Sequence, residues 1–246
     1  MAKQRLHKVL AAAGVDSRRN CEELILEGAV CVNRKVVDSL PAFVDPDVDM
    51  ITVSGRRIHA AQKVYFLLNK PKGVICSNRD PQGRKMAIEL IPTDLRIFCV
   101  GRLDIDTTGI IILTNDTELS NKLTHPRYGL SKTYVVCVKG RIEAEEIQKL
   151  KSGIWLAEGK TARTSVKILK RNFKESLVEI TIGQGLNRQI RRMFAKVGFP
   201  VKSLKRTGIG KLTSRGLGVG RYRRLSEAEL GYLKKARKAR KAKGDA

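Results

Sequence analysis

Two short apolar runs with a charged segment between them constrain this chain more than any other feature. The first run, residues 97–100, predicts a buried strand, and the second, residues 110–113, predicts another. The segment between them carries one arginine and two aspartates: Arg102, Asp104 and Asp106. Taken alone, this pattern is more often a turn with a surface ion pair. A charged loop held between two core strands is also a common place for catalytic side chains.

The charge of the chain indicates a polyanionic partner. The sequence holds 49 Lys and Arg against 24 Asp and Glu, a formal net charge of +25. Residues 1–60 hold 9 basic and 8 acidic residues, residues 61–199 hold 25 and 13, and residues 200–246 hold 15 and 3. An excess of this size is typical of nucleic-acid-binding proteins. The excess lies almost entirely after residue 60.

Composition also indicates the cellular compartment and argues against some cofactors. No apolar run approaches the ~20 residues of a membrane span, and the first residues lack the apolar segment of a signal peptide. The 5 Cys are scattered and never form C-x-x-C, which argues against a disulfide framework and against zinc. We therefore expect a cytoplasmic protein with reduced thiols, no bound metal and no nucleotide cofactor. A monomer is assumed.

The first sixty residues predict a small module of two helices and short strands. Apolar periodicity predicts helices over residues 5–13 and 17–28. A strand, a tight turn at Asn33-Arg34 and a second strand are expected over residues 29–37, with a further strand over residues 50–53. The size suits a compact RNA-binding unit.

Three strings in this module carry a resemblance to a known family. They are R-L-x-K-x-L-A-x-A-G, S-R-R and G-x-V-x-V-N. Together they resemble the RNA-binding module named after the fourth small-subunit ribosomal protein, here called the S-four module. The resemblance implies that its second helix and the following turn face RNA. The matching positions are Arg18, Arg19, Asn33 and Lys35; a solvated polar face is the alternative for each.

The rest of the chain resembles a second family. Gly-Arg-Leu-Asp, followed by Thr, Gly, an apolar run and Thr-Asn-Asp, is similar to the central motif of the pseudouridine synthases of the small- and large-subunit ribosomal RNA class. L-N-K-P-K-G-V, before it, and N-R-Q-I-R-R-M, after it, resemble the first and third motifs of that family. The three motifs stand in the family's order over some 130 residues.

The resemblance implies an α+β fold with a mixed, largely antiparallel sheet. We expect the S-four module over residues 1–60, a catalytic domain over residues 64–232 and a basic tail over residues 233–246. In the catalytic domain, Val64–Leu68 and Val74–Ser77 are expected to form a hairpin around the Pro- and Gly-containing turn. The tail is expected to touch phosphates or to remain free.

The family resemblance also implies the chemistry. The N1-glycosidic bond of one uridine is cut, the uracil turns, and C5 bonds to C1′, so that no cofactor is needed. Asp104 matches the catalytic aspartate, as nucleophile or base, and Arg191 matches the residue that pairs with it. Tyr134 matches the ring that packs on the base, and Arg102 the side chain that enters the space the base leaves. Arg188, in the third motif, is expected to contact the substrate.

Several alternatives stay open. Asp106 competes with Asp104, and only the register of the motif favours the latter. A non-enzymatic protein that binds ribosomal RNA or assists assembly would also need the module and the charge. A methyltransferase would need a glycine-rich cofactor loop, and none is found. H-P-R-Y-G-L-S-K-T-Y and G-L-N-R-Q-I-R-R-M lean toward large-subunit 23S rRNA, with small-subunit 16S rRNA as the alternative. Free RNA and an assembling subunit precursor both remain possible substrates.

Overall fold

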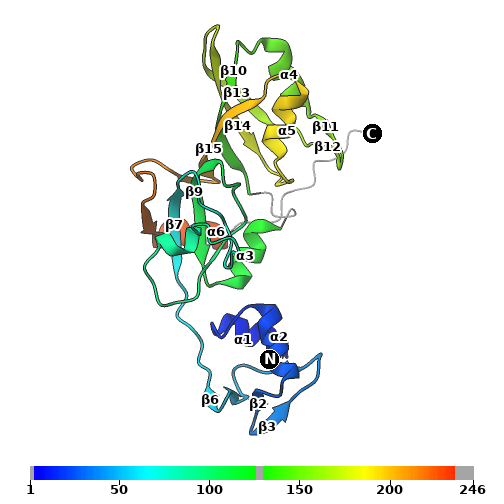
Figure 1. The fold of residues 1–246 in the computed structure, drawn as a ribbon, viewed down its shortest axis with the longest axis vertical. Helices are drawn as coiled ribbons and strands as arrows, with labels where there is room; N and C mark the ends of the chain where they lie inside the picture. The colour runs from blue at the N-terminus through cyan, green and yellow to red at the C-terminus, as the bar shows by residue number, and fades with distance from the viewer. Residues whose placement is uncertain (1–2, 126–129, 236–246) are drawn as a thin grey trace. The chain divides into compact units, whose positions relative to one another are not determined.

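The computed structural model describes residues 3–125 and 130–235, and these fall into two compact units (Figure 1). The first unit comprises Met1–Val64 together with the short segments Thr93–Ile97 and Asn115–Thr117. The second unit comprises Tyr65–Pro92, Phe98–Thr114 and the chain from Glu118 onward. Each is described by itself below.

The first unit packs two helices on a small sheet. Helix α1 spans Leu6–Ala12 and helix α2 spans Arg18–Leu26. Ser17 caps α2, because its side chain accepts a hydrogen bond from the backbone N–H of Asn20 at 3.1 Å. The strands are β1 (Gln4–Arg5), β2 (Val30–Val32), β3 (Lys35–Val37), β4 (Phe43–Val44), β5 (Ile51–Val53) and β6 (Arg56–Arg57).

The apolar faces of these elements make one core. Its fully buried members come from both helices and from strand β2: Leu6, Leu10, Cys21, Ile25 and Val30. They recur at the helical spacing that the sequence predicts. The turn after β2 has Asn33 at φ 51° and Arg34 at φ 69°, as a tight two-residue hairpin turn requires. The two helices and the strand–turn–strand expected in this unit are therefore confirmed.

The second unit is built on a nine-stranded sheet. The main path runs β13-β14-β10-β15-β9-β7-β17, with β16 paired to β15 and β8 to β9. Within the part of the chain that is described, β15 pairs with β9 in parallel and the other ladders of this sheet are antiparallel. This confirms the expected α+β fold with a mixed, largely antiparallel sheet. The strands of this path and its branches are β7 (Tyr65–Lys70), β8 (Phe98–Cys99), β9 (Thr107–Thr114), β10 (Lys132–Lys139), β13 (Ser165–Arg171), β14 (Glu175–Ile182), β15 (Val201–Ile209), β16 (Leu212–Thr213) and β17 (Tyr222–Arg224).

Helices cover this sheet at both ends, as Figure 1 shows. Helices α3 (Thr117–Thr124) and α6 (Glu227–Lys234) contribute leucines to a core with strands β7 and β9. Helices α4 (Ala144–Ser152) and α5 (Gln189–Lys196) lie by β10, β13 and β14 (Figure 1). A two-stranded ribbon, β11 (Trp155–Leu156) with β12 (Gly159–Lys160), and a 3-10 helix, η1 (Ala87–Leu90), complete the unit. None of the described helices is long and apolar enough to cross a bilayer.

Two local expectations are wrong. Residues 74–77 do not form the return strand of a hairpin; the segment makes a single parallel bridge, between Ile75 and Met86. Strand β7 runs on to Lys70 and pairs on its two sides with β9 and β17, so neither edge is left for residues 74–77. Strand β9 begins at Thr107, three residues before the start that the sequence predicts, and the charged loop is correspondingly shorter.

Candidate active site

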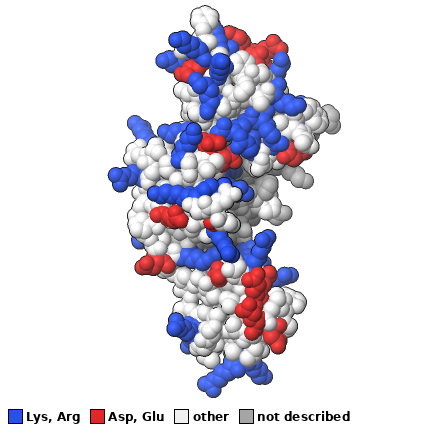
Figure 2. Space-filling view, in the orientation of Figure 1, with Lys and Arg blue, Asp and Glu red and all other residues white. Residues whose placement is uncertain are grey.

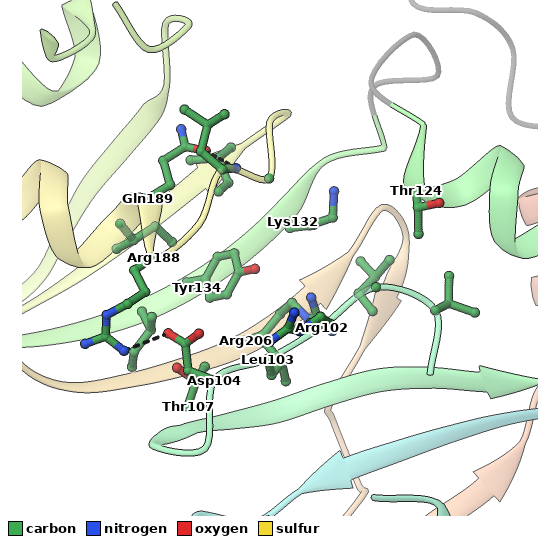
Figure 3. Close-up of a pocket in the computed structure, with 18 of the residues that line it drawn as sticks. Arg102, Leu103, Asp104, Thr107, Thr124, Lys132, Tyr134, Arg188, Gln189 and Arg206 are labelled. Atoms are coloured by element: carbon green, nitrogen blue, oxygen red, sulfur yellow. Dashed lines mark hydrogen bonds and ion pairs between the residues drawn. The ribbon is translucent and has the colours of Figure 1, made fainter. Parts of the chain in front are cut away.

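A pocket of about 420 Å³ opens on the face of the large sheet (Figure 3). Seven separate parts of the catalytic unit line it: the charged loop, β9, the end of α3, β10, the end of β14, β15 and the start of α5 with the loop before it. The lining residues that bear on chemistry are Arg102, Asp104, Thr107, Lys132, Tyr134, Arg188 and Arg206. Sequence reasoning named four of these, and the structure brings those four together.

Backbone contacts fix the charged loop that carries Asp104. The N–H of Thr107 donates to the carbonyl oxygen of Asp104 at 3.0 Å, which closes a turn. The N–H of Gly73 donates to the carbonyl oxygen of Ile105 at 2.9 Å, so the first motif holds the loop from behind. The N–H of Leu103 donates to Sγ of Cys76 at 3.4 Å. These three hydrogen bonds tie the loop that carries Asp104 to itself and to the first motif.

Behind this loop lies a buried cation that the sequence did not reveal. Lys70 is fully buried, and its Nζ donates to the carbonyl oxygens of Pro71 at 3.0 Å and Val74 at 2.6 Å. Burial lowers the pKa of Lys70, and the nearby thiols of Cys76 and Cys99 partly offset this. A hydrogen bond from Cys99 lowers the pKa of Cys76 to about 6. Lysines next to a Pro- and Gly-containing turn are normally solvent-exposed, so nothing in the sequence indicated that Lys70 is buried.

Two arginines from one motif face the carboxylate of Asp104. Nη1 of Arg188 donates a hydrogen bond to Oδ2 of Asp104 at 3.3 Å, and Nε of Arg191 lies 3.9 Å from the same oxygen. Figure 3 shows the Arg188 side chain reaching toward Asp104. The sequence pointed to Arg191 as the partner; in the structure Arg188 shares that position and makes the hydrogen bond.

The two arginines differ in how they are held. The side chain of Arg191 is 14% exposed, and its Nη atoms lie at hydrogen-bonding distance from the carbonyl oxygens of Val201 (3.4 Å) and Asp106 (3.5 Å). The side chain of Arg188 is 49% exposed, and its backbone stands in the left-handed region at φ 44°. A non-glycine residue in that region is uncommon and often marks a functional position. The side chain of Arg191 is thus held in place by backbone contacts, while that of Arg188 is partly exposed to solvent.

Aromatic and basic side chains complete the wall. Tyr134 is 7% exposed, lines the pocket from β10 and is aligned with Arg206 on β15. Arg102 is exposed, lines the pocket and stands two residues before Asp104 in the charged loop. Asp106 is exposed and does not line the pocket. Among the residues with a described position, no group of three or more His, Cys, Asp or Glu could hold a metal ion.

The candidate RNA-binding side chains of the S-four module are placed differently. Arg18, Arg19 and Lys35 are exposed. Asn33 is also exposed, but its Nδ2 donates to Oδ1 of Asp49 at 2.8 Å and its Oδ1 accepts from the N–H of Met50 at 2.9 Å. Its amide therefore holds the turn in place. Figure 2 shows acidic side chains beside the basic ones on this module, in keeping with its near-zero net charge.

The pocket thus holds an aspartate that faces two arginines, with a tyrosine in the same wall, on a mixed sheet that follows a small αβ module in the chain. The chain belongs to the RNA pseudouridine synthases: the family described as RNA pseudouridylate synthase matches residues 64–196. The S4 domain family matches residues 4–47, so the protein is of the type in which that module precedes the synthase domain.

Its relatives include characterised and uncharacterised members of the family. The ribosomal large subunit pseudouridine synthase B of Bacillus subtilis is 47% identical over 94% of this chain and 96% of its own length. An uncharacterized RNA pseudouridine synthase of Aquifex aeolicus is 42% identical over 96% of each chain. A solved structure described as a pseudouridylate synthase superposes with a TM-score of 0.69 at 31% identity and covers 93% of this chain.

Proposed function

We propose that the protein converts one uridine of large-subunit ribosomal RNA into pseudouridine, with Asp104 as the catalytic residue. The observation that carries the proposal is the placement of the Asp104 carboxylate in the pocket, facing two arginines, with Tyr134 in the same wall. The large subunit is favoured because the 47% identical relative is named for it. The assembling subunit and the free RNA remain alternative forms of this substrate.

The pocket residues suit this isomerisation step by step. An enzyme that acts on a base within folded RNA first turns the nucleotide out of its stack, at a cost of a few kcal/mol. Tyr134 would then pack on the uracil ring. Asp104, which faces two arginine side chains, would act as nucleophile or base at the ribose. Arg102, exposed at the rim, would occupy the space that the base leaves.

The reaction leaves the atomic composition of the nucleotide unchanged. The N1–C1′ bond breaks and its electron pair stays on the uracil. The ring turns, C5 bonds to C1′, the proton on C5 is lost, and N1 takes up a proton. The product is an isomer of uridine, so the chemistry calls for no oxidant, donor group or nucleotide cofactor.

RNA contacts outside the pocket are assigned to the S-four module and to the tail. The exposed side chains of Arg18, Arg19 and Lys35 are the proposed phosphate contacts of the module. Asn33 is proposed to contribute to RNA binding by holding the conformation of its turn, not by contacting RNA itself. The basic tail was expected over residues 233–246; residues 236–246 lie outside the described part of the chain.

The test is to incubate the purified protein with large- and small-subunit ribosomal RNA, without additives, and to map pseudouridine at single-nucleotide resolution. EDTA treatment after the RNA has folded should leave the product unchanged. A single new site in large-subunit RNA is the expected result. A site in small-subunit RNA would correct the target. Binding to RNA with no product in either RNA would favour a non-enzymatic assembly protein.

A further inference from the structure

The floor of the active-site pocket holds a buried arginine with an unused hydrogen-bond donor. Arg206 is 3% exposed and lines the pocket from β15. Its Nε donates to the carbonyl oxygen of Ile110 at 2.6 Å. Its Nη2 is buried and has no hydrogen-bond partner among the described residues. A buried charged donor left unsatisfied costs free energy, so a ligand that supplies an acceptor is expected there.

The strands hold this arginine rigidly. Arg206 is aligned with Tyr134 of β10 on one side and with Gly109 of β9 on the other. Gly109 has φ +108°, and a Cβ at that position would overlap the backbone of Arg206. Only glycine allows the two strands to approach this closely. Arg206 is thus set in the sheet beside Tyr134 on the neighbouring strand, and both residues line the pocket (Figure 3).

A second cation lines the same pocket. Lys132 stands two residues before Tyr134 on β10, and its Nζ donates to the carbonyl oxygen of Leu130 at 3.3 Å. Burial and, secondly, the charge of Arg206 lower the pKa of Lys132. The nearest carboxylate in the pocket lining is that of Asp104, which is engaged with Arg188 and Arg191. A buried arginine and a half-buried lysine therefore line the pocket, and no carboxylate is assigned to either of them.

A uracil ring supplies the hydrogen-bond acceptors that this part of the pocket lacks. It presents two carbonyl oxygens, O2 and O4, as acceptors. When the N1–C1′ bond breaks with its electron pair left on the ring, negative charge spreads onto those oxygens. Preorganised donors aimed at developing charge are among the strongest sources of catalysis, and removing one typically costs about 10²–10³ in rate.

We propose that Arg206 and Lys132 donate hydrogen bonds to the carbonyl oxygens of the target uracil and stabilise the uracil anion released when the glycosidic bond breaks. This rests on the proposed function, since uridine must occupy the pocket. The charge is dissipated when C5 bonds to C1′, the C5 proton leaves and N1 is protonated. The two cations thus act on the departing base, while Asp104 acts at the ribose.

The test compares two target bases in the same RNA, uridine and 5-fluorouridine. Fluorine at C5 withdraws electrons and makes the departing ring a weaker base, so the reaction should depend less on the cations. The variants of the full-length protein are Lys132→Met and Arg206→Lys. The matched control is Lys139→Met, an exposed lysine at the other end of strand β10. Consumption of the target base is followed in single turnovers at saturating enzyme, and RNA affinity is measured separately.

We expect Lys132→Met and Arg206→Lys to slow uridine consumption by about tenfold or more, with RNA affinity changed by less than about threefold. With 5-fluorouridine the deficit should shrink by at least about threefold, because a more stable anion needs less help. Lys139→Met should match the wild type. A merely structural role would slow both bases equally.

Three results would overturn the inference. The first is an equal deficit with both bases; the second is no deficit in either variant. The third is a wild-type protein that consumes neither base in any ribosomal RNA, which would remove the proposed function as well. If Lys132→Met fails to fold, Lys132→Gln and Arg206→Lys give the same comparison.

Discussion

The two units of this chain place their polar side chains in opposite ways. In the catalytic unit, Asp104, Tyr134 and Arg188 come from a loop, a strand and a helix start, and they line one pocket. In the S-four module, Arg18 and Lys35 stand exposed on a helix and on a strand, each in contact with solvent. The first arrangement concentrates function in a few atoms, and the second spreads it over a surface.

This difference predicts how strongly the loss of a single side chain affects the function of each unit. Where several groups act on the same atoms, losing one removes most of the effect, because the remaining groups cannot compensate. Where charges contact phosphates one by one, each loss removes only its own share. Four predictions, in order of decreasing expected effect, test this contrast.

Asp104→Asn should reduce product formation by about 10³-fold or more, because the side chain keeps its size but loses its anionic charge. RNA affinity should hold or rise, since a negative charge near phosphates is removed. Asp106→Asn should retain most activity, because its exposed side chain lies outside the pocket lining. Single-turnover rates of the two variants at saturating enzyme show which aspartate is required for the reaction. The reverse ranking would show that the motif register is wrong.

Arg191→Ala and Arg188→Ala should differ although both arginines face Asp104. Arg191 is largely buried and ties Asp104 to the backbone of Val201 and Asp106, so its loss should slow the reaction by about 10²-fold and lower the free energy of unfolding by about 1–3 kcal/mol. Arg188 is half exposed, so its loss should cost less than about 1 kcal/mol of stability. Urea unfolding and single-turnover kinetics measure both. Equal losses of stability and rate in the two variants would contradict the inference that Arg191 is held in place while Arg188 is solvent-exposed.

Removing the S-four module should weaken RNA binding by about tenfold or more, while the bound complex still turns over near the full-length rate. A chain starting at Ala60 keeps the backbone of Gln62 and Val64, which the side chain of Asn115 holds at 2.8 and 3.0 Å. Binding titrations and single turnovers separate affinity from chemistry. Unchanged affinity would mean that the module serves another purpose.

Single substitutions on the module should have the smallest effects. Arg18→Ala and Arg19→Ala should each change affinity by less than about threefold and lower the slope of log affinity against log salt by about 0.7–0.9. Asn33→Ala should instead loosen the turn, because it removes the bonds to Asp49 and Met50. Salt titrations of RNA binding and thermal unfolding of the variants distinguish the two outcomes. A loss of more than about tenfold from either arginine alone would break the contrast between the units.

Local patterns predicted much of this structure. The two helices of the module follow from residues within one or two turns of each other. Family motifs located the loop that bears Asp104. These features depend on neighbours in the sequence, so a single chain without its structure reveals them.

Long-range pairing accounts for what the sequence did not reveal. Strand β7 pairs with β17, some 150 residues later, and no local signal predicts that partner. The hairpin expected at residues 74–77 is wrong because it assumed that consecutive strands pair. Arg206 stands in V-K-S-L-K-R-T-G-I, where basic residues suggest a solvated strand. Its one sequence signal is that it shares a face with Leu204, two residues before it.

The position of β15 has a consequence for how the protein is made. The strand lies between β10 and β9, which precede it in the chain by more than 60 residues. A ribosome releases its product from the amino end at about 5–20 residues per second. The S-four module can therefore fold while the remainder is still being synthesised, but β9 and β10 stay apart until β15 emerges. Arg188 and Arg191, which face Asp104, and Arg206, which lines the pocket, all belong to that last third of the chain. If the module binds RNA as proposed, we expect a nascent chain of this protein to bind RNA seconds before its active site is assembled.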